Sequence, residues 1–104
     1  MKDRRCVLLL FYDVPMGASA DRRKYKRFRS SLISSGFCAM QESVYVKLLH
    51  NRAQEADAVK EAAALAPNGN VSVLTLSLPT FRRMRTLRGT PFDVEKFSDD
   101  ILYF

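Results

Sequence analysis

Residue types that build metal centres, disulfide scaffolds and membrane spans are scarce in this chain. Its 104 residues include two cysteines and a single histidine, His50. Cys6 and Cys38 lie in apolar runs at a spacing that matches no zinc or redox motif, so we expect buried thiols in a reducing cytoplasm. No apolar run approaches the roughly 20 residues of a membrane span, and no small-residue cleavage site follows the first run. We therefore expect a cytoplasmic protein that makes no use of a membrane.

Positive charge is concentrated in the first half of the chain. The net formal charge is +6, from 17 Lys and Arg against 11 Asp and Glu. Residues 1–54 hold eleven basic and four acidic residues, whereas residues 55–104 hold six and seven, so the halves are about +7 and −1. A basic half attracts nucleic acid, an acidic membrane surface or an acidic partner, and charge alone does not choose among them.

The order of predicted elements indicates an α+β fold of the ferredoxin-like type. We expect strands at 7–12, 37–40, 43–48 and 71–78, and helices at about 19–35 and 51–65, capped by Ser19 or Asp21 and by Asn51. Gly36 is placed to close the first helix in a left-handed conformation, and Thr80 to cap a short helix over Phe81–Leu87. This order describes one antiparallel sheet with two helices on one face. We therefore expect a ferredoxin-like domain over 1–90 and a tail over 91–104.

The first strand predicts a second copy of the chain. Val7–Tyr12 is apolar throughout, as in a strand that is buried on both faces. Two helices cover only one face of such a sheet, so the other face needs a partner. A homodimer is the expectation.

Asp13 stands where the first strand stops, just before the basic segment Asp21–Arg29. An acid beside dense positive charge suggests a metal ion and phosphate. The alternative is that Asp13 only stabilises the turn before Pro15, because Asp is a frequent turn former. Candidates for a general base are few, since His50 is expected to be a surface or capping residue.

Three segments carry a resemblance to a known family. They are FYDVP at 11–15, RRKYKRFRSSLISSGF at 22–37 and MQESVYVKL at 40–48. In this order they resemble the CRISPR-associated Cas-two family, the small partner of the Cas-one integrase in spacer acquisition, and look closest to the forms of type II systems. The resemblance covers about 7–89. It implies a ferredoxin-like homodimer in which Asp13 faces its symmetry mate, so that two carboxylates share one magnesium ion that polarises a phosphodiester.

Two groups of basic residues are candidates for contact with the backbone of duplex DNA, or of RNA. On the first helix, Tyr25, Phe28 and Leu32 form the core stripe, which leaves Arg22, Arg23, Lys26 and Arg27 on the remaining face. A solvated face is the alternative, above all for Lys24 and Arg29, whose directions the sequence does not fix. The resemblance extends the DNA role to Arg82, Arg83, Arg85 and Arg88, which have almost no neighbouring acid between Thr80 and Pro91.

The tail is acidic and rich in aromatic and aliphatic side chains that are costly to leave in water. Its candidate docking residues are Phe92, Val94, Phe97, Ile101 and Leu102. They would add a strand to the sheet of the other protomer or dock on the Cas-one integrase by strand addition. The alternative is a tail that folds back on its own domain.

Three functions follow from these observations. The first is a DNA-holding scaffold of the spacer-integration complex, with metal-dependent endonuclease activity in addition. The second is a magnesium-dependent endoribonuclease or DNase that acts alone, with Asp13 as its catalytic residue and with Ser43 and Tyr45 lining the cleft. The third is a ferredoxin-like RNA-binding module, which ranks last because the aromatic pair Phe11 and Tyr12 is adjacent rather than displayed on separate strands.

Overall fold

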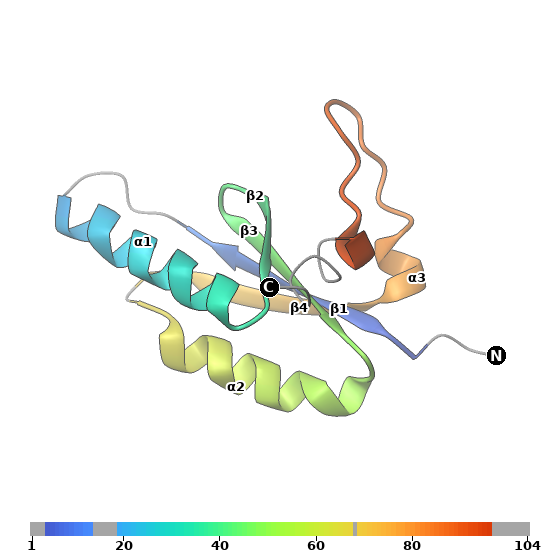
Figure 1. Ribbon diagram of the computed structural model, residues 1–104, viewed down its shortest axis with the longest axis horizontal. Helices are drawn as coiled ribbons and strands as arrows, with labels where there is room; N and C mark the ends of the chain where they lie inside the picture. The colour runs from blue at the N-terminus through green and yellow to red at the C-terminus, as the bar shows by residue number, and fades with distance from the viewer. Residues whose placement is uncertain (1–3, 14–18, 68, 97–104) are drawn as a thin grey trace.

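The computed structural model of the protein describes residues 4–13, 19–67 and 69–96 (Figure 1). In chain order its elements are β1 (Cys6–Tyr12), α1 (Ser19–Ser34), β2 (Cys38–Gln41), β3 (Val44–Leu49), the 3-10 helix η1 (Arg52–Gln54), α2 (Glu55–Leu65), β4 (Val71–Ser77) and α3 (Leu78–Phe81). The strands form one antiparallel sheet in the order β2-β3-β1-β4. The α+β class and the predicted order of strands and helices are confirmed. The side chains expected to cap α1, those of Ser19 and Asp21, lie outside the described residues.

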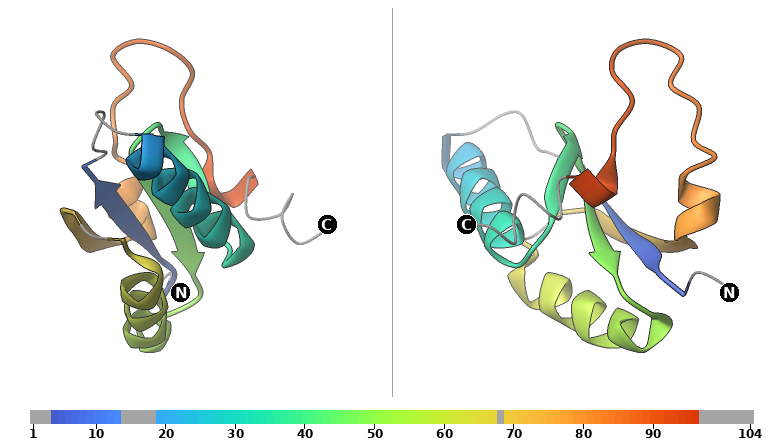
Figure 2. Two further views of the ribbon diagram at one scale, coloured as in Figure 1. Left: turned by 90° about the vertical axis from the view of Figure 1, so that its left-hand side faces the viewer. Right: turned by 45° about the vertical axis from the view of Figure 1, so that its right-hand side comes forward.

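β1 lies at the centre of the sheet and is buried on both faces, as its apolar sequence predicts. Cβ atoms alternate along a strand, so Leu8 and Leu10 point to the face that α1 and α2 cover (Figure 2). Val7 and Leu9 point to the opposite face and belong to a second core cluster. All four side chains are no more than 4% exposed.

The first core cluster fixes α1 and α2 against the sheet. Phe28 and Leu32 of α1 are buried, and Tyr25 packs at the edge of the cluster, which confirms the predicted core stripe. From α2, Ala58 and Ala62 are buried in the same cluster.

Gly36 closes α1 in the predicted left-handed conformation. Its φ is +94°, a value that side chains with a Cβ rarely adopt. The amide of Phe37 then donates to the carbonyl of Leu32 at 2.9 Å, which satisfies one of the last carbonyls of the helix.

The predicted starts of two helices are wrong. α3 spans Leu78–Phe81 rather than Phe81–Leu87, and its cap is Ser77, whose Oγ accepts from the amide of Thr80 at 3.2 Å. Pro79 lies in the first turn of this helix, where its missing N–H costs nothing, so it starts the helix as well as following the strand. Asn51 makes no capping bond, and a turn of 3-10 helix precedes α2 instead.

The sheet face away from α1 and α2 is only partly open. α3 contributes Leu78 and Phe81 to the second core cluster, and the segment after it contributes Val94, which is 3% exposed. Towards the other end of the sheet, Phe11 remains 39% exposed and Leu74 51% exposed. The expectation of an uncovered face therefore holds for the end of β1 near Asp13.

Both cysteines are buried free thiols, as expected. Burial raises the pKa of Cys6 and of Cys38, so both thiols stay neutral. Of the helices that the structure describes, none has the length and apolar character required to cross a bilayer.

The packing of Val94 predicts a measurable loss of stability on truncation. Val94→Ala should lower the free energy of unfolding by about 1–2 kcal/mol, because it removes two buried carbon atoms from a closed cluster. Urea denaturation measures this value. Val73→Ala is the matched control, since Val73 is 39% exposed and should lose clearly less. Equal losses for both variants would contradict the burial of Val94 in the core.

Candidate nucleic-acid interface

Asp13 is exposed at the end of β1. Its backbone amide donates to the carbonyl of Asn70 at 3.0 Å, and the amide of Tyr12 donates to the carbonyl of Ser43 at 3.0 Å. These two bonds hold the strand end between the starts of β3 and β4. The backbone of Asp13 is therefore fixed while its carboxylate faces solvent.

Asp13 belongs to no cluster of metal-ligating side chains in the part of the chain that the structure describes. Over the described residues no group of three His, Cys, Asp or Glu side chains is arranged to hold a metal ion. His50 is at the opposite end of the sheet, because Cys6, the first residue of β1, pairs with Leu49. It is exposed, and its amide donates to Oε1 of Gln54 at 2.8 Å. It is a surface residue, in keeping with one of the two roles expected for it.

The aromatic residues beside Asp13 support α1. Tyr12 stacks on Tyr25 with ring centroids 5.8 Å apart and meets the edge of Phe28 at 5.2 Å. The hydroxyl of Tyr25 donates to the carbonyl of Glu42 at 2.5 Å and lies 2.8 Å from the hydroxyl of Tyr45. Tyr45 is completely buried among these groups, so it supports the helix and does not line an open cleft.

The four predicted cations of α1 are all exposed, as contact with a nucleic-acid backbone requires: Arg22, Arg23, Lys26 and Arg27. Because Phe28 and Leu32 face the sheet, this basic face points away from it. None of the ion pairs found among the described residues involves these four side chains.

Arg29 has a position that the sequence did not fix. It lines a shallow pocket with Tyr25 and the β2 residues Met40 and Gln41. Burial raises the pKa of Tyr45, the hydrogen bond with Tyr25 raises it further, and the guanidinium of Arg29 acts in the opposite direction. Arg29 thus lies close to the tyrosine hydroxyls, at the flank of the basic face.

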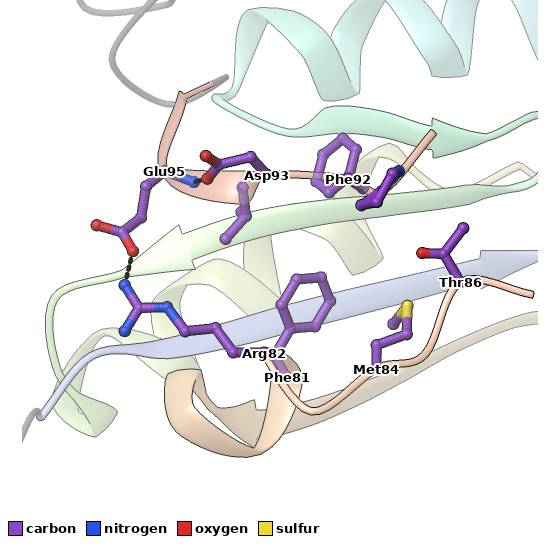
Figure 3. A pocket seen from close by; sticks show the side chains of 9 residues that line it. Phe81, Arg82, Met84, Thr86, Phe92, Asp93 and Glu95 are labelled. Atoms are coloured by element: carbon purple, nitrogen blue, oxygen red, sulfur yellow. Dashed lines mark hydrogen bonds and ion pairs between the residues drawn. The ribbon is translucent and has the colours of Figure 1, made fainter. Parts of the chain in front are cut away.

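The second predicted cluster, Arg82, Arg83, Arg85 and Arg88, follows α3 and is exposed throughout. The sequence predicts almost no acid beside these arginines, but the fold brings one there. Glu95 pairs with Arg82 through one carboxylate oxygen (Figure 3). Its other carboxylate oxygen pairs with Arg5 at 2.9 Å. Glu95 lies beyond the segment from Thr80 to Pro91 and reaches Arg82 only because the chain turns back.

The described part of the tail folds back on its own domain, which is the alternative to docking on a partner. Val94 is buried against the chain's own sheet and Phe92 is partly buried beside it, so this segment is folded on its own domain (Figure 3). The side chain of Asp93 accepts from the amides of Glu95 and Lys96 and closes a short turn there. The other predicted docking residues, Phe97, Ile101 and Leu102, lie outside the described residues.

Comparison with known proteins gives consistent matches. A family model described as CRISPR associated protein Cas2 matches residues 6–84, which include every strand of the sheet. The chain is 37% identical over 90 residues to the CRISPR-associated endoribonuclease Cas2 of Acidovorax ebreus, covering 86% of this chain and 88% of that one. It is 34% identical over 84 residues to the protein of the same name from Lacticaseibacillus rhamnosus, covering 80% and 83%.

The fold is also similar to a solved structure, described as the crystal structure of Streptococcus pyogenes Cas2 at pH 6.5. The TM-score is 0.55 at 21% identity, and the match covers 79% of this chain and 99% of that chain. At this identity the match supports the architecture of the sheet and helices alone.

The two ion pairs of Glu95 predict slow local opening of the tail segment 94–96. Glu95→Gln should speed hydrogen exchange at the amides of 94–96 by up to about five-fold, because partly exposed ion pairs contribute up to about 1 kcal/mol. Hydrogen exchange followed by NMR measures this. Glu61→Gln, which changes an exposed carboxylate on α2, is the control and should leave these amides unaffected. Unchanged exchange in Glu95→Gln would show that apolar packing alone holds the segment.

Proposed function

The chain belongs to the CRISPR-associated Cas2 family, and from this premise we propose that it acts in spacer acquisition as a homodimeric scaffold that holds duplex DNA with the Cas-one integrase. The single observation that carries the proposal is the exposed basic face of α1. Guanidinium and ammonium groups on a rigid helix suit phosphate oxygens and hold a duplex without reading its sequence.

The exposed apolar surface near Asp13 supports a homodimer. Leu9 pairs with Leu74 in the ladder, and Phe11 follows two residues later, so Phe11 and Leu74 are neighbours on one face. A second copy that covers this patch would bring two Asp13 side chains towards the dimer axis.

The loop from Arg82 to Pro91 supports the same assembly. Every residue of it is exposed, Leu87 by 92%, and the loop projects from the body of the protein (Figures 1 and 2). An exposed apolar side chain on such a loop is costly in water and fits a contact with a second protomer. β4 is an edge strand, so it also offers free backbone groups for pairing.

A magnesium ion would fit the dimeric arrangement. Mg²⁺ is bound by one or two carboxylates and keeps several waters, which matches one Asp13 from each protomer. When bound there, the ion would polarise a phosphodiester and lower the pKa of a bound water. Two curated relatives are named endoribonucleases, and this makes metal-dependent cleavage of RNA or DNA the second proposed function.

Charge reversal on α1 tests the scaffold. The double variant Arg22→Glu, Lys26→Glu should bind duplexes of any sequence more weakly, with a log affinity against log salt slope that is shallower by about 2. Fluorescence anisotropy over a salt series gives both values. Lys60→Glu on α2 is the control, because Lys60 is exposed and outside the basic face. An unaltered slope in the double variant would refute the contact.

Asp13→Asn separates the metal role from DNA binding. The variant should lose magnesium binding in calorimetric titration and any magnesium-dependent cleavage, while its affinity for duplex DNA in the absence of magnesium stays within two-fold. Asp57→Asn, which alters an exposed carboxylate of α2, should behave like the unmodified protein. Magnesium binding or cleavage that persists in Asp13→Asn would contradict the metal assignment.

A further inference from the structure

A second basic site lies at the end of β1 opposite Asp13. A pocket of about 290 Å³ is lined there by Arg4, Arg5, Cys6, Asn51, Arg52 and Ser77. None of its arginines belongs to the two basic groups described above. The pocket is therefore a separate concentration of positive charge.

The antiparallel ladder brings these residues together. Cys6 pairs with Leu49 of β3 on one side and with Ser77 of β4 on the other. The chain before β1 thus lies beside the chain that leaves β3, where Asn51 and Arg52 begin the path into α2. Residues almost fifty positions apart meet here because β1 begins where β3 and β4 end.

The local charges leave an excess of positive charge in the pocket. Glu95 pairs with Arg5, and Glu55 lies 3.8 Å from Arg52, whose side chain is 65% exposed. No ion pair found among the described residues involves Arg4. Burial raises the pKa of the Cys6 thiol, so the pocket holds no thiolate that would repel an anion.

The polar groups that line the pocket are hydrogen-bond donors suited to an anion. They are the guanidinium groups of Arg4, Arg5 and Arg52, the amide of Asn51 and the hydroxyl of Ser77. Asn51 adds an amide donor that is not used as a helix cap. Arginine forks and amide groups together are the donors that bind phosphate oxygens.

We propose that this pocket binds a phosphate of a nucleic-acid backbone, with Arg4 and Arg52 as its principal contacts. The proposal rests on the proposed function and extends it, because it adds a second point of contact for the same class of ligand. Arg5 and Asp13 are eight residues apart on an extended strand, or about 26 Å at about 3.3 Å per residue. A duplex rises by about 3.4 Å per base pair, so this distance equals about eight base-pair steps.

The double variant Arg4→Gln, Arg52→Gln tests the site. Anisotropy is measured with a 30-base-pair duplex and with a 30-nucleotide RNA, over a salt series. We expect the affinity for at least one of them to fall several-fold and its salt slope to become shallower by about 2, one for each lost contact. A loss with duplex alone or with RNA alone identifies the backbone that the pocket holds.

Two further variants exclude effects of net charge and of folding. Lys60→Gln, Lys96→Gln removes the same charge from exposed sites elsewhere and should change the affinity less than two-fold. Arg4→Lys, Arg52→Lys keeps the charge and should restore part of the affinity and of the slope. Equal losses in the glutamine double variant and the Lys60 and Lys96 control would overturn the proposal, because charge alone would then explain binding.

The outcome also separates this inference from the proposed function. If the charge-reversed α1 variant loses binding while Arg4→Gln, Arg52→Gln keeps its affinity and slope, the pocket proposal is wrong and the scaffold stands. If neither variant alters binding, both proposals fail. A matching melting temperature for the unmodified protein and each variant shows that any loss is local.

Discussion

Burial of β1 on both faces is the constraint on which the rest of the structure depends. Leu8 and Leu10 hold α1 and α2 on one side, while Val7 and Leu9 hold α3 and the segment around Val94 on the other. Hydrogen bonding to β3 and β4 on either edge leaves the strand no freedom to shift its register. Everything attached to its two ends is therefore held at a fixed separation.

The two ends of β1 carry different chemistry. Asp13 stands exposed at one end, with the cations of α1 arranged beyond the tyrosines that pack next to it. Arg4, Arg5 and Arg52 gather at the other end, where His50 also lies. The histidine is thus kept away from the carboxylate, and over the described residues no group of three His, Cys, Asp or Glu side chains forms around Asp13. The two ends of β1 therefore present an acid and a group of arginines separately.

Glu95 makes the two predicted basic groups unequal. Its carboxylate is shared by Arg5 and Arg82, and it ties the tail segment to the start of β1 and to the end of α3. The cations of α1 are opposed by no such carboxylate among the described residues. The two basic groups therefore differ in the electrostatic field at their surface, because the group that contains Arg82 folds next to the carboxylate of Glu95.

The sequence alone determined the order of the strands and helices, the core stripe of α1 and the left-handed turn at Gly36. These features depend on neighbouring residues, through apolar periodicity and the steric freedom of glycine. The sequence pattern misplaced α3, because a proline such as Pro79 can either end a strand or begin a helix. Only the hydrogen bond from the amide of Thr80 to the hydroxyl of Ser77 decides between the two. The exposure of the α1 cations followed from the same periodicity, while the flank position of Arg29 did not.

Only the tertiary structure decided which distant charges meet. The pairing of Arg5 with Glu95 joins residues 90 positions apart, and the pocket around Arg4 and Arg52 joins the chain before β1 to the chain after β3. Such contacts depend on strand register and on the path of the tail, which no local pattern encodes. Asp13 was visible in the sequence as an acid at a strand end, but its position opposite the arginine pocket follows from the length and burial of the strand between them.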